Sequence, residues 1–228
     1  MLVLALDTST RTTTVAVAVS VDVAEASGSR TRVLAEHADD APNRHGEVLA
    51  PLVDRALRDA GAARADIGLV AVGVGPGPFT GLRVGLVTAL GLADALGVPV
   101  RGVCSLDAVA AHVGRPWPDG FAVAADARRK EVYWATYRDG RRTSGPAVGA
   151  PADVAAELDP GMTVVGAGAV LYADVFGARR VDGRAPEPSA GDLAALACDE
   201  QWVVPAQPMY LRRPDARPPG APKKVTRA

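Results

Sequence analysis

The chain has 228 residues, of which 48% are hydrophobic and 22% charged, and its formal net charge at pH 7 is −1. These values predict a globular protein with a sizeable core, and they exclude a wholly disordered chain and a strongly basic nucleic-acid-binding domain. Cys104 and Cys198 are far apart and form no C-x-x-C pair, so neither a zinc site nor a disulfide framework is expected. The apolar start is too short for a signal peptide, and we expect no stretch long enough to span a membrane. The composition therefore predicts a cytoplasmic protein.

The first half of the chain alternates between apolar strand patterns and helical patterns. Strands are predicted over residues 2–6, 13–19, 33–36, 66–74 and 99–103. Helices are predicted over residues 44–60 and 81–96, followed by a short helix from residue 105 to 113. Asn43, Thr80 and Ser105 are the expected N-caps of these helices, and Gly61 is the expected end of the first.

The pattern restarts after a proline- and glycine-rich linker at residues 114–120. Strands are predicted over residues 121–125, 131–137 and 162–165, and helices over 152–158, 169–176 and 189–200, the last capped by Ser189. Each half opens with a hairpin whose turn begins with an aspartate, Asp7 or Asp126, and each later has a strand, a G-x-G turn and a helix. This repetition suggests an internal duplication. It predicts an α/β fold of two ribonuclease-H-like lobes.

Three regions follow from this division. They are an N-terminal lobe at residues 1–113 that binds a partner, a C-terminal lobe at 114–212, and a basic, proline-rich tail at 213–228. From Arg212 to Ala228 the chain carries four prolines and six basic residues against one acid, so we predict that the tail is disordered. It is either simply solvated or makes loose contacts with RNA.

The glycine-rich segment G-V-G-P-G-P-F-T-G-L-R-V-G, residues 73–85, joins a predicted strand to a predicted helix. A glycine turn before a helix can present backbone N–H groups to an anion. Pro76 and Pro78 remove such donors, however, and no lysine follows as a phosphate-binding loop requires. The segment is therefore either a tight turn for close packing of helix and sheet or a degenerate anion site.

The helix after this turn carries small residues at four-residue spacing, beside a stripe of leucines. Small side chains along one ridge let another element approach closely. The approaching element is either the protein's own sheet or a partner that also contacts the helix at residues 44–60. The sequence alone leaves both alternatives open.

The polar residues do not form a recognisable catalytic set. His45 and Glu47 lie near a helix start but lack the H-E-x-x-H spacing of a zinc site, so no metal ligands are predicted. Asp7, with the hydroxyl residues after it, either makes a self-bonded turn or holds a nucleotide-bound Mg²⁺ through water. Turn chemistry and a surface ion pair suffice to explain Asp126 with Arg128 and Arg129. His37 and His112 have no readable partner, and no catalytic residue is predicted.

Several motifs together resemble the TsaB family. They are D-T-S-T at residues 7–10, H-x-E-x-L-x-P at 45–51, G-P-G-P-F-T-G-L-R at 75–83, S-L at 105–106, D-A-R at 126–128 with E-V-Y at 131–133, and Y-L-R at 210–212. The resemblance covers residues 1–212, and the glycine motif is its most specific part. Pro78 stands where that motif usually has serine.

The resemblance implies a two-lobed, actin-like ATPase fold and a non-catalytic subunit of the bacterial machinery that makes threonylcarbamoyladenosine in tRNA. Its implied partners are the catalytic subunit TsaD, the ATPase TsaE and, through the complex, tRNA, with a homodimer when the chain is alone. TsaD transfers a threonylcarbamoyl group to the adenosine beside the anticodon. No cofactor of the chain's own is implied, and ATP or ADP would bind in the assembled complex.

Two sets of residues are expected to carry these roles. The partner interface is predicted at Leu49, Leu52, Leu82, Gly85, Leu86, Ala89 and Ala93. A vestigial nucleotide site is predicted at Asp7, Thr8, Gly75 and Gly77. Replacing Ala89 with glutamate should then abolish co-purification with TsaD without disturbing the fold. The competing function classes are a glycoprotease-like metallopeptidase and an independent ATPase.

Overall fold

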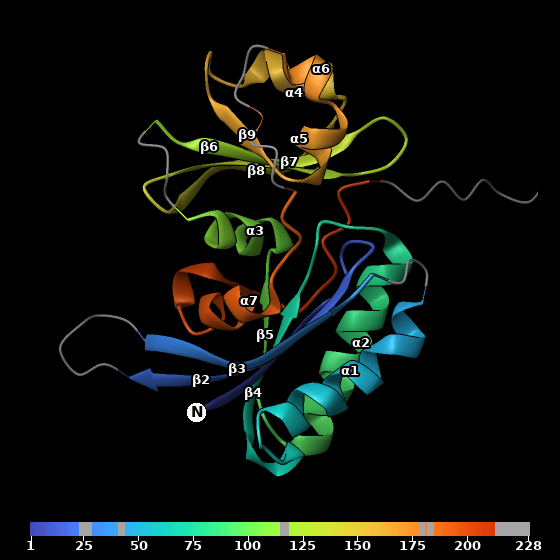
Figure 1. The fold of residues 1–228 in the computed structure, drawn as a ribbon, viewed down its shortest axis with the longest axis vertical. Coiled ribbons are helices and arrows are strands. Elements are labelled where there is room, and N and C mark those ends of the chain that lie inside the picture. Colours follow the sequence, from blue (N-terminus) through green and yellow to red (C-terminus); the bar gives the residue numbers. More distant parts are fainter. Residues whose placement is uncertain (23–28, 41–43, 115–118, 178–180, 182–184, 213–228) are drawn as a thin grey trace, which may run out of the picture.

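A computed structural model describes residues 1–22, 29–40, 44–114, 119–177, 181 and 185–212. The chain forms two lobes, each a mixed sheet with helices, placed one above the other in Figure 1. Helix α3 lies between the two sheets in that view. The proposed two-lobed α/β plan is therefore the observed one.

The first sheet has six strands in the order β10-β5-β4-β1-β2-β3. Its members are β1 (Leu2–Asp7), β2 (Thr13–Asp22), β3 (Ser29–Asp39), β4 (Ile67–Gly73), β5 (Val100–Val103) and β10 (Val203–Val204). Strand β1 is antiparallel to β2 and parallel to β4, because a short turn follows β1 whereas a helical crossover precedes β4. Both faces of this sheet are covered, which explains why β1 reads as a continuous apolar run.

Helices α1 (His45–Asp59) and α2 (Phe79–Leu96) cover one face of the first sheet, and α7 (Ala190–Leu196) covers the other. Side chains alternate along β1, so Leu4 and Leu6 pack with α1 and α2 while Val3 and Ala5 pack with α7. Short 3₁₀ turns occur at Arg64–Asp66 and Glu200–Trp202.

The second sheet has four strands in the order β8-β7-β6-β9. They are β6 (Phe121–Asp126), β7 (Val132–Arg138), β8 (Arg141–Gly149) and β9 (Thr163–Val165), with helices α4 (Pro151–Glu157), α5 (Ala167–Leu171) and α6 (Ala173–Phe176) on one face. Helix α3 (Ser105–Val113) covers the other face and therefore lies between the two lobes. Strand β6 is antiparallel to β7 and parallel to β9, as β1 is to β2 and β4.

The C-terminal segment returns to the first lobe. Helix α7 packs on β1 and β2, and β10 pairs with β5. The expected C-terminal lobe at residues 114–212 therefore loses its last part to the first lobe. The reason is that the outer face of β1 and the edge of β5 would otherwise expose apolar side chains and unpaired backbone groups.

Several expected element boundaries are wrong. Strand β8 was not expected, and β3 extends well beyond residues 33–36. The predicted end of the first helix is confirmed, because α1 ends at Asp59 with Ala60 as its C-cap, and Gly61 follows with a positive φ of 65°. Thr80 and Ser105 are not N-caps but lie inside their helices, Thr80 two positions after the N-cap Pro78 and Ser105 one position after the N-cap Cys104. Ser189 is an N-cap as predicted and accepts a hydrogen bond from the backbone N–H of Asp192. Asn43 lies outside the described residues.

The expectation about membrane spans is also wrong in one respect. Helix α2 has 18 residues and a mean hydropathy of 1.4, so by length and composition it could cross a membrane. In this fold its buried side chains pack with β1 and β4 in the core of the first lobe. Only 33% of that window is buried, so part of its apolar character comes from residues that the first lobe does not cover.

Candidate functional site

Asp7, at the end of β1, is buried and bonded entirely to its own lobe. Its Oδ1 accepts hydrogen bonds from the backbone N–H of Ser9 at 2.7 Å and from Ser9 Oγ at 2.6 Å, and its Oδ2 accepts one from Ser105 Oγ at 2.5 Å. Burial raises the pKa of the Asp7 carboxyl, and the hydrogen bonds from Ser105 and Ser9 oppose that rise. The turn interpretation of Asp7 is therefore supported by its contacts.

Thr8 joins this turn to helix α2. Its Oγ1 donates to the carbonyl of Gly81 at 2.7 Å and accepts from the N–H of Gly85 at 3.1 Å. A Cβ on Gly85 would lie 2.4 Å from Thr8 Oγ1, so only glycine allows this approach. The small-residue stripe of α2 therefore serves close packing on the protein's own sheet.

The glycine turn after β4 is packed against the Asp7 turn. The N–H of Gly75 donates to Ser105 Oγ at 3.2 Å, and a Cβ on Gly77 would lie 2.3 Å from the Ser9 carbonyl oxygen. The four predicted nucleotide-site residues are thus brought together around Ser9 and Ser105. Asp7, Thr8 and Gly75 form hydrogen bonds within the first lobe, and Gly77 lies against the backbone of Ser9.

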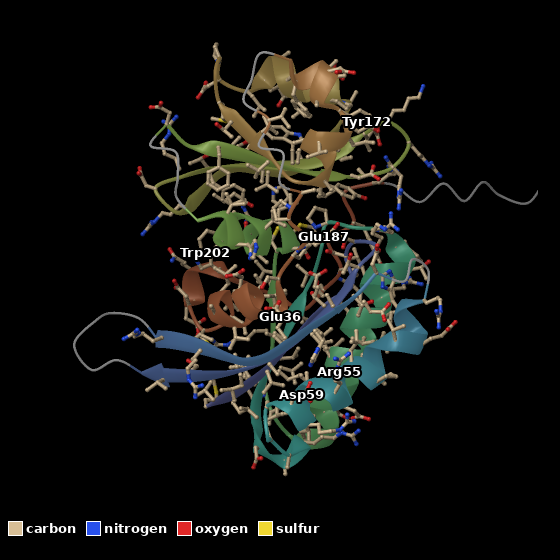
Figure 2. All side chains as sticks on the ribbon, viewed as in Figure 1. Glu36, Arg55, Asp59, Tyr172, Glu187 and Trp202 are labelled. Carbon is tan, nitrogen blue, oxygen red and sulfur yellow. The ribbon has the colours of Figure 1, made fainter. Side chains whose placement is uncertain are left out.

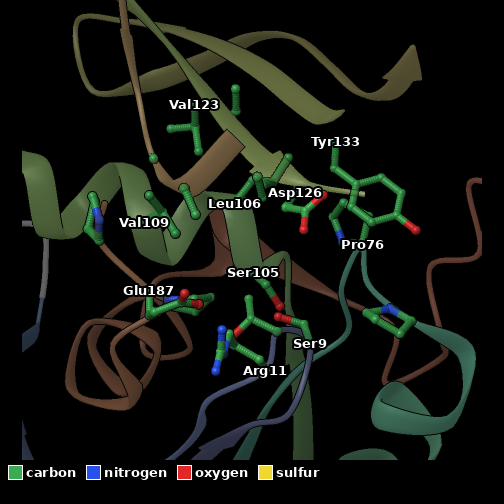
Figure 3. A pocket seen from close by; sticks show the side chains of 18 of the residues that line it. Ser9, Arg11, Pro76, Ser105, Leu106, Val109, Val123, Asp126, Tyr133 and Glu187 are labelled. Atoms are coloured by element: carbon green, nitrogen blue, oxygen red, sulfur yellow. The ribbon is translucent and has the colours of Figure 1, made fainter. Parts of the chain in front are cut away.

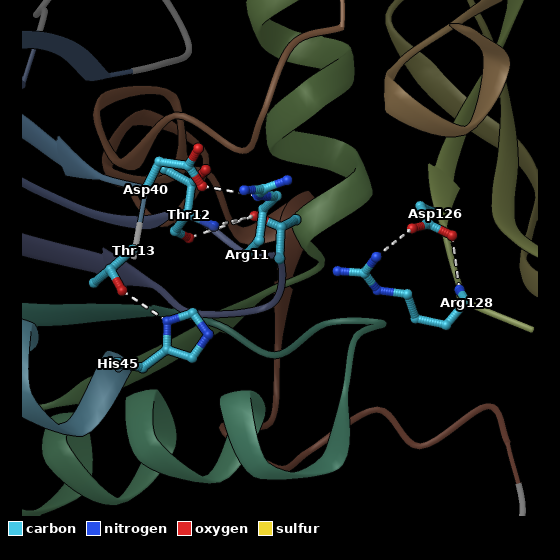
Figure 4. A network of polar contacts seen from close by, with 8 residues as sticks. Arg11, Thr12, Thr13, Asp40, His45, Asp126 and Arg128 are labelled. Atoms are coloured by element: carbon cyan, nitrogen blue, oxygen red, sulfur yellow. Dashed lines mark hydrogen bonds and ion pairs between the residues drawn. The ribbon is translucent and has the colours of Figure 1, made fainter. Parts of the chain in front are cut away.

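His45 and Glu47 do not share a site. His45 is buried, and its Nδ1 lies 2.7 Å from Thr13 Oγ1 (Figure 4). Exposed Glu47 instead accepts a hydrogen bond from Arg44 Nε at 2.8 Å. Burial lowers the pKa of the His45 imidazole. In the part of the chain that the structure describes, no three His, Cys, Asp or Glu side chains gather as a metal site would need.

The seven residues predicted to form a partner interface are buried inside the first lobe. Six of them belong to the cluster that packs α1 and α2 on the sheet, and Gly85 contacts Thr8 as described above. Ala89 is fully buried, so a glutamate there would unfold the lobe rather than report on a partner. The large apolar residues of α2 that are exposed are Phe79, Val87 and Leu90.

A cavity of about 300 Å³ lies between the lobes. Its lower wall includes Ser9 and Arg11 from the turn after β1, and its upper wall includes Asp126 and Tyr133 from the second sheet (Figure 3). Glu187 closes one side, in the segment that leads back to α7, and lies at the junction of the lobes in Figure 2. Glu187 has no motif around it, so sequence reasoning missed it.

Most charges at this cavity are paired. Arg11 Nε donates to Asp40 Oδ1 at 2.8 Å, and Asp126 accepts from the backbone N–H of Arg128 at 2.8 Å and pairs with its guanidinium at 3.2 Å (Figure 4). The turn and ion pair expected for Asp126 are therefore observed. Arg128, Arg129 and Lys130 have positive φ angles of 59°, 54° and 62°, which concentrates backbone strain beside the cavity.

A buried polar cluster connects α3 to the second sheet. Asp107 accepts a hydrogen bond from Tyr137 Oη at 2.8 Å and pairs with Arg142 at 3.0 Å through both of its oxygens. Because removing one member of a buried ion pair leaves an uncompensated charge, this cluster fixes how the second sheet sits on α3. Sequence reasoning missed all three residues, which lie far apart along the chain.

The last described segment, residues 205–212, runs between the lobes. Tyr210 stacks on Phe79 with ring centroids 4.9 Å apart and accepts from Arg83 Nε at 3.2 Å, while Arg83 lies over the Phe79 ring. At the other end, Arg212 pairs with Glu131 of the second lobe. The segment therefore ties the start of α2 to the second lobe.

Known proteins of similar sequence and structure identify the family of this chain. The family model of TsaD, described as tRNA N6-adenosine threonylcarbamoyltransferase, matches residues 36–170. The Escherichia coli tRNA threonylcarbamoyladenosine biosynthesis protein TsaB is 34% identical over 77% of this chain and 84% of its own length. The chain belongs to the TsaB family. The solved structure of YeaZ from Pseudomonas aeruginosa superposes on this TsaB-family chain with a TM-score of 0.73 and 33% identity, over 92% of this chain and 99% of that one.

Closer relatives of this TsaB-family chain are uncharacterized proteins. One from Mycobacterium tuberculosis H37Rv is 48% identical over 82% of this chain and 83% of its own length. One from Mycobacterium leprae is 47% identical over 81% of this chain, but the match spans only 49% of that longer protein. The resemblance to TsaB and the expected fold, two ribonuclease-H-like lobes of the actin-like ATPase superfamily, are confirmed.

Proposed function

We propose that this chain is a non-catalytic subunit of the complex that synthesises threonylcarbamoyladenosine in tRNA, where it supports the transferase TsaD. The observation that carries the proposal is the inward bonding of the Asp7 and glycine turns in a member of the TsaB family. These turns meet at the cleft between the lobes, where a catalytic relative would need groups free to contact substrate. A scaffold needs only a stable fold and a docking face.

We place that docking face on the outer side of α2. Val87 is 68% exposed and Leu90 is 43% exposed, and they lie three positions apart, so they share one face of the helix. Phe79 extends this face at the helix start and is itself 45% exposed. Apolar side chains grouped on one face of a core helix favour burial against the matching apolar face of a partner subunit. The expected partners are TsaD, with TsaE in the larger assembly, and a second copy when TsaD is absent.

Reconstitution tests the proposal. Modification of tRNA by TsaD and TsaE is measured with and without this chain, and product should be lost on omission, with no product from the chain alone. A Val87→Glu, Leu90→Glu double variant should keep the melting temperature and lose co-purification with TsaD. The matched control is Ala156→Glu, which adds a glutamate at an exposed position of α4 in the second lobe, away from the face of Val87 and Leu90. Product formation by the isolated chain would overturn the non-catalytic role, and retained binding by the double variant would overturn the face.

The two enzyme alternatives have separate signatures. A metallopeptidase would show chelator-sensitive peptide hydrolysis that His45→Ala abolishes, yet His45 is turned to Thr13 and buried. An independent ATPase would show turnover lost in Asp7→Ala, yet Asp7 is bonded to Ser9 and Ser105. We therefore expect neither activity from the purified chain. Nucleotide would bind to the assembled complex, and the whole would work in the cytoplasm.

A further inference from the structure

The turn between β6 and β7 carries three consecutive basic residues in a strained conformation. Arg128, Arg129 and Lys130 have φ angles of 59°, 54° and 62°, and all three are exposed. Glycine and asparagine adopt this left-handed region readily, whereas long side chains such as arginine and lysine rarely do. The fold therefore sustains backbone strain to place basic side chains at this position, and strain of this kind indicates a function for them.

Hydrogen bonds within the turn hold its backbone in one conformation. The N–H of Ala127 donates to the Glu131 carbonyl at 3.0 Å, and the N–H of Glu131 donates to the Arg128 carbonyl at 3.1 Å. The N–H of Arg128 donates to Asp126 Oδ1 at 2.8 Å. Because these bonds close the turn on itself, the backbone groups are occupied and the three basic side chains are what the turn offers to a ligand.

Two other segments bring further basic residues to this turn. Arg212, at the end of the last described segment, pairs with Glu131 and donates to the Arg128 carbonyl at 3.4 Å. Two residues earlier, Tyr210 accepts a hydrogen bond from Arg83, which is exposed near the start of α2. The start of α2, the last described segment and the turn are therefore joined by direct contacts.

Positive charge prevails where these three segments meet. Residues 79–83, 126–131 and 205–212 contain five basic side chains and two carboxylates. Each carboxylate pairs with one arginine, so three positive charges remain in excess. The excess continues along the sequence, because residues 212–228 hold six basic residues and one acid although the whole chain has 25 basic and 26 acidic residues. The five basic residues, here called the basic patch, are Arg83, Arg128, Arg129, Lys130 and Arg212.

We propose that the basic patch binds the phosphate backbone of RNA. Guanidinium groups donate two hydrogen bonds at once to phosphate oxygens, and the lysine ammonium adds a compact positive charge. Contacts of this kind position a nucleic acid without reading its bases, so the binding does not depend on sequence. Because the chain as a whole has a net charge of −1, the attraction is local, and the chain alone binds RNA weakly.

In the assembled complex this RNA is the tRNA, an identification that rests on the proposed function. The patch begins where the docking face on α2 ends, since Tyr210 both stacks on Phe79 of that face and accepts a hydrogen bond from Arg83. A tRNA bound by TsaD at α2 would therefore reach the patch directly.

An Arg129→Asn, Lys130→Asn double variant tests the assignment. It removes two charges, and asparagine adopts the left-handed conformation more readily, so the melting temperature should equal or exceed that of the wild type. The probe is a labelled, unmodified tRNA transcript, titrated at several salt concentrations with the full chain alone and with the full chain bound to TsaD. The slope of log affinity against log salt should become shallower by about 1.5, because each phosphate contact contributes about 0.7–0.9, and affinity at low salt should fall about tenfold.

The matched control removes two charges from the other end of β7. Arg138 and Arg141 are exposed there, in the hairpin that joins β7 to β8. Arg138→Gln, Arg141→Gln should bind tRNA with the wild-type affinity and salt slope. The proposal is overturned if the double asparagine variant also binds like the wild type, or if the control loses as much affinity. It is equally overturned if phosphatidylserine–phosphatidylcholine vesicles or polyglutamate bind as tightly as tRNA, since the patch would then serve a membrane or an acidic protein.

Co-purification with TsaD separates this proposal from the proposed function. The double asparagine variant should retain TsaD, because its substitutions lie outside the docking face on α2. If the wild-type chain does not bind TsaD, the proposed function fails, and the titration of the chain alone still decides the patch. If TsaD is retained and tRNA affinity is unchanged, the patch alone is wrong.

Discussion

The two lobes contain the same strand–turn arrangement, and they use it in opposite ways. In the first lobe Asp7 is 1% exposed and is bonded to Ser9 and Ser105. In the second lobe Asp126 lies at the equivalent strand end, lines the cavity, and pairs with exposed Arg128. The turn of the first lobe is therefore part of the core, and that of the second is part of a surface. A duplicated motif need not retain a duplicated role.

The glycine turns show the same difference more mildly. A Cβ on Gly73, the last residue of β4 before the first glycine turn, would lie 1.7 Å from Asp7 Oδ2. A Cβ on Gly168, in the second turn, would come no closer than 2.9 Å to the Ala125 carbonyl carbon and Val132 Cγ1. Both turns bring a helix close to a strand. Only the first also encloses a carboxylate, so the first lobe is the less tolerant of change.

The largest effect is expected from adding a methyl group at Gly73. Gly73→Ala should lower the free energy of unfolding by about 3 kcal/mol or more, because the buried Asp7 network must move to make room. Urea unfolding of the full chain measures this. Gly168→Ala should cost less, and the comparison fails if the two variants are equally destabilised.

A glycine in open space provides the control. Gly91 lies in the interior of exposed α2 with nothing within 4 Å of its added Cβ. Gly91→Ala should stabilise the chain by about 0.5–1 kcal/mol through helix propensity alone. A loss of stability at Gly91 would mean that the Gly73 result reports on glycine substitution in general.

The next effect concerns the hydroxyl that joins β1 to α2. Thr8→Val keeps the side-chain shape but removes both hydrogen bonds, to the Gly81 carbonyl and from the Gly85 N–H. Because buried groups lose their partner, the free energy of unfolding should fall by about 1–3 kcal/mol. The control is Thr12→Val, in the same turn but half-buried; equal losses in both would contradict a specific role for Thr8.

A smaller effect is expected in the pH dependence of the free energy of unfolding, to which His45 contributes. Burial lowers its pKa in the folded state from the ordinary 6.5, so the unfolded chain takes up the proton first as the pH falls. The stability associated with neutral His45 is therefore present above pH 6.5 and is lost as the pH falls through that value toward the lower folded pKa.

Unfolding curves of the wild type and of His45→Asn at several pH values measure this contribution. Asparagine can keep a hydrogen bond to Thr13 but does not titrate, so the difference in stability between the two proteins should change in favour of His45→Asn as the medium becomes acidic. A difference that is constant with pH would show that His45 is not the titrating group. The second lobe has no histidine among its described residues and gives no such signal.

Sequence patterns predicted the plan of the fold better than the use of its parts. Apolar runs and glycine turns report local structure, so the two lobes, most strands and the Ser189 cap could be predicted. Whether a helix face is covered by the protein's own sheet or by a partner could not be predicted, because the pattern of Leu82 and Leu86 is the same in both cases. Glu187 reaches the cavity only because the chain returns to the first lobe after the second sheet. The Asp107 cluster forms only because the second sheet, which carries Tyr137 and Arg142, packs against α3.

The smallest effect is expected where the second lobe departs from the first. Asp126→Asn removes the charge opposite Arg128 but keeps an acceptor for the Arg128 N–H, and the guanidinium is mostly exposed. An exposed ion pair contributes only about 0–1 kcal/mol, so the free energy of unfolding should change by about 0.5 kcal/mol or less. The equivalent Asp7→Asn change alters a fully buried network and should shift stability measurably at neutral pH. If Asp126→Asn were as disruptive as Asp7→Asn, the strained turn at residues 128–130 would depend on the Asp126 charge, and the second lobe would use its aspartate as the first does.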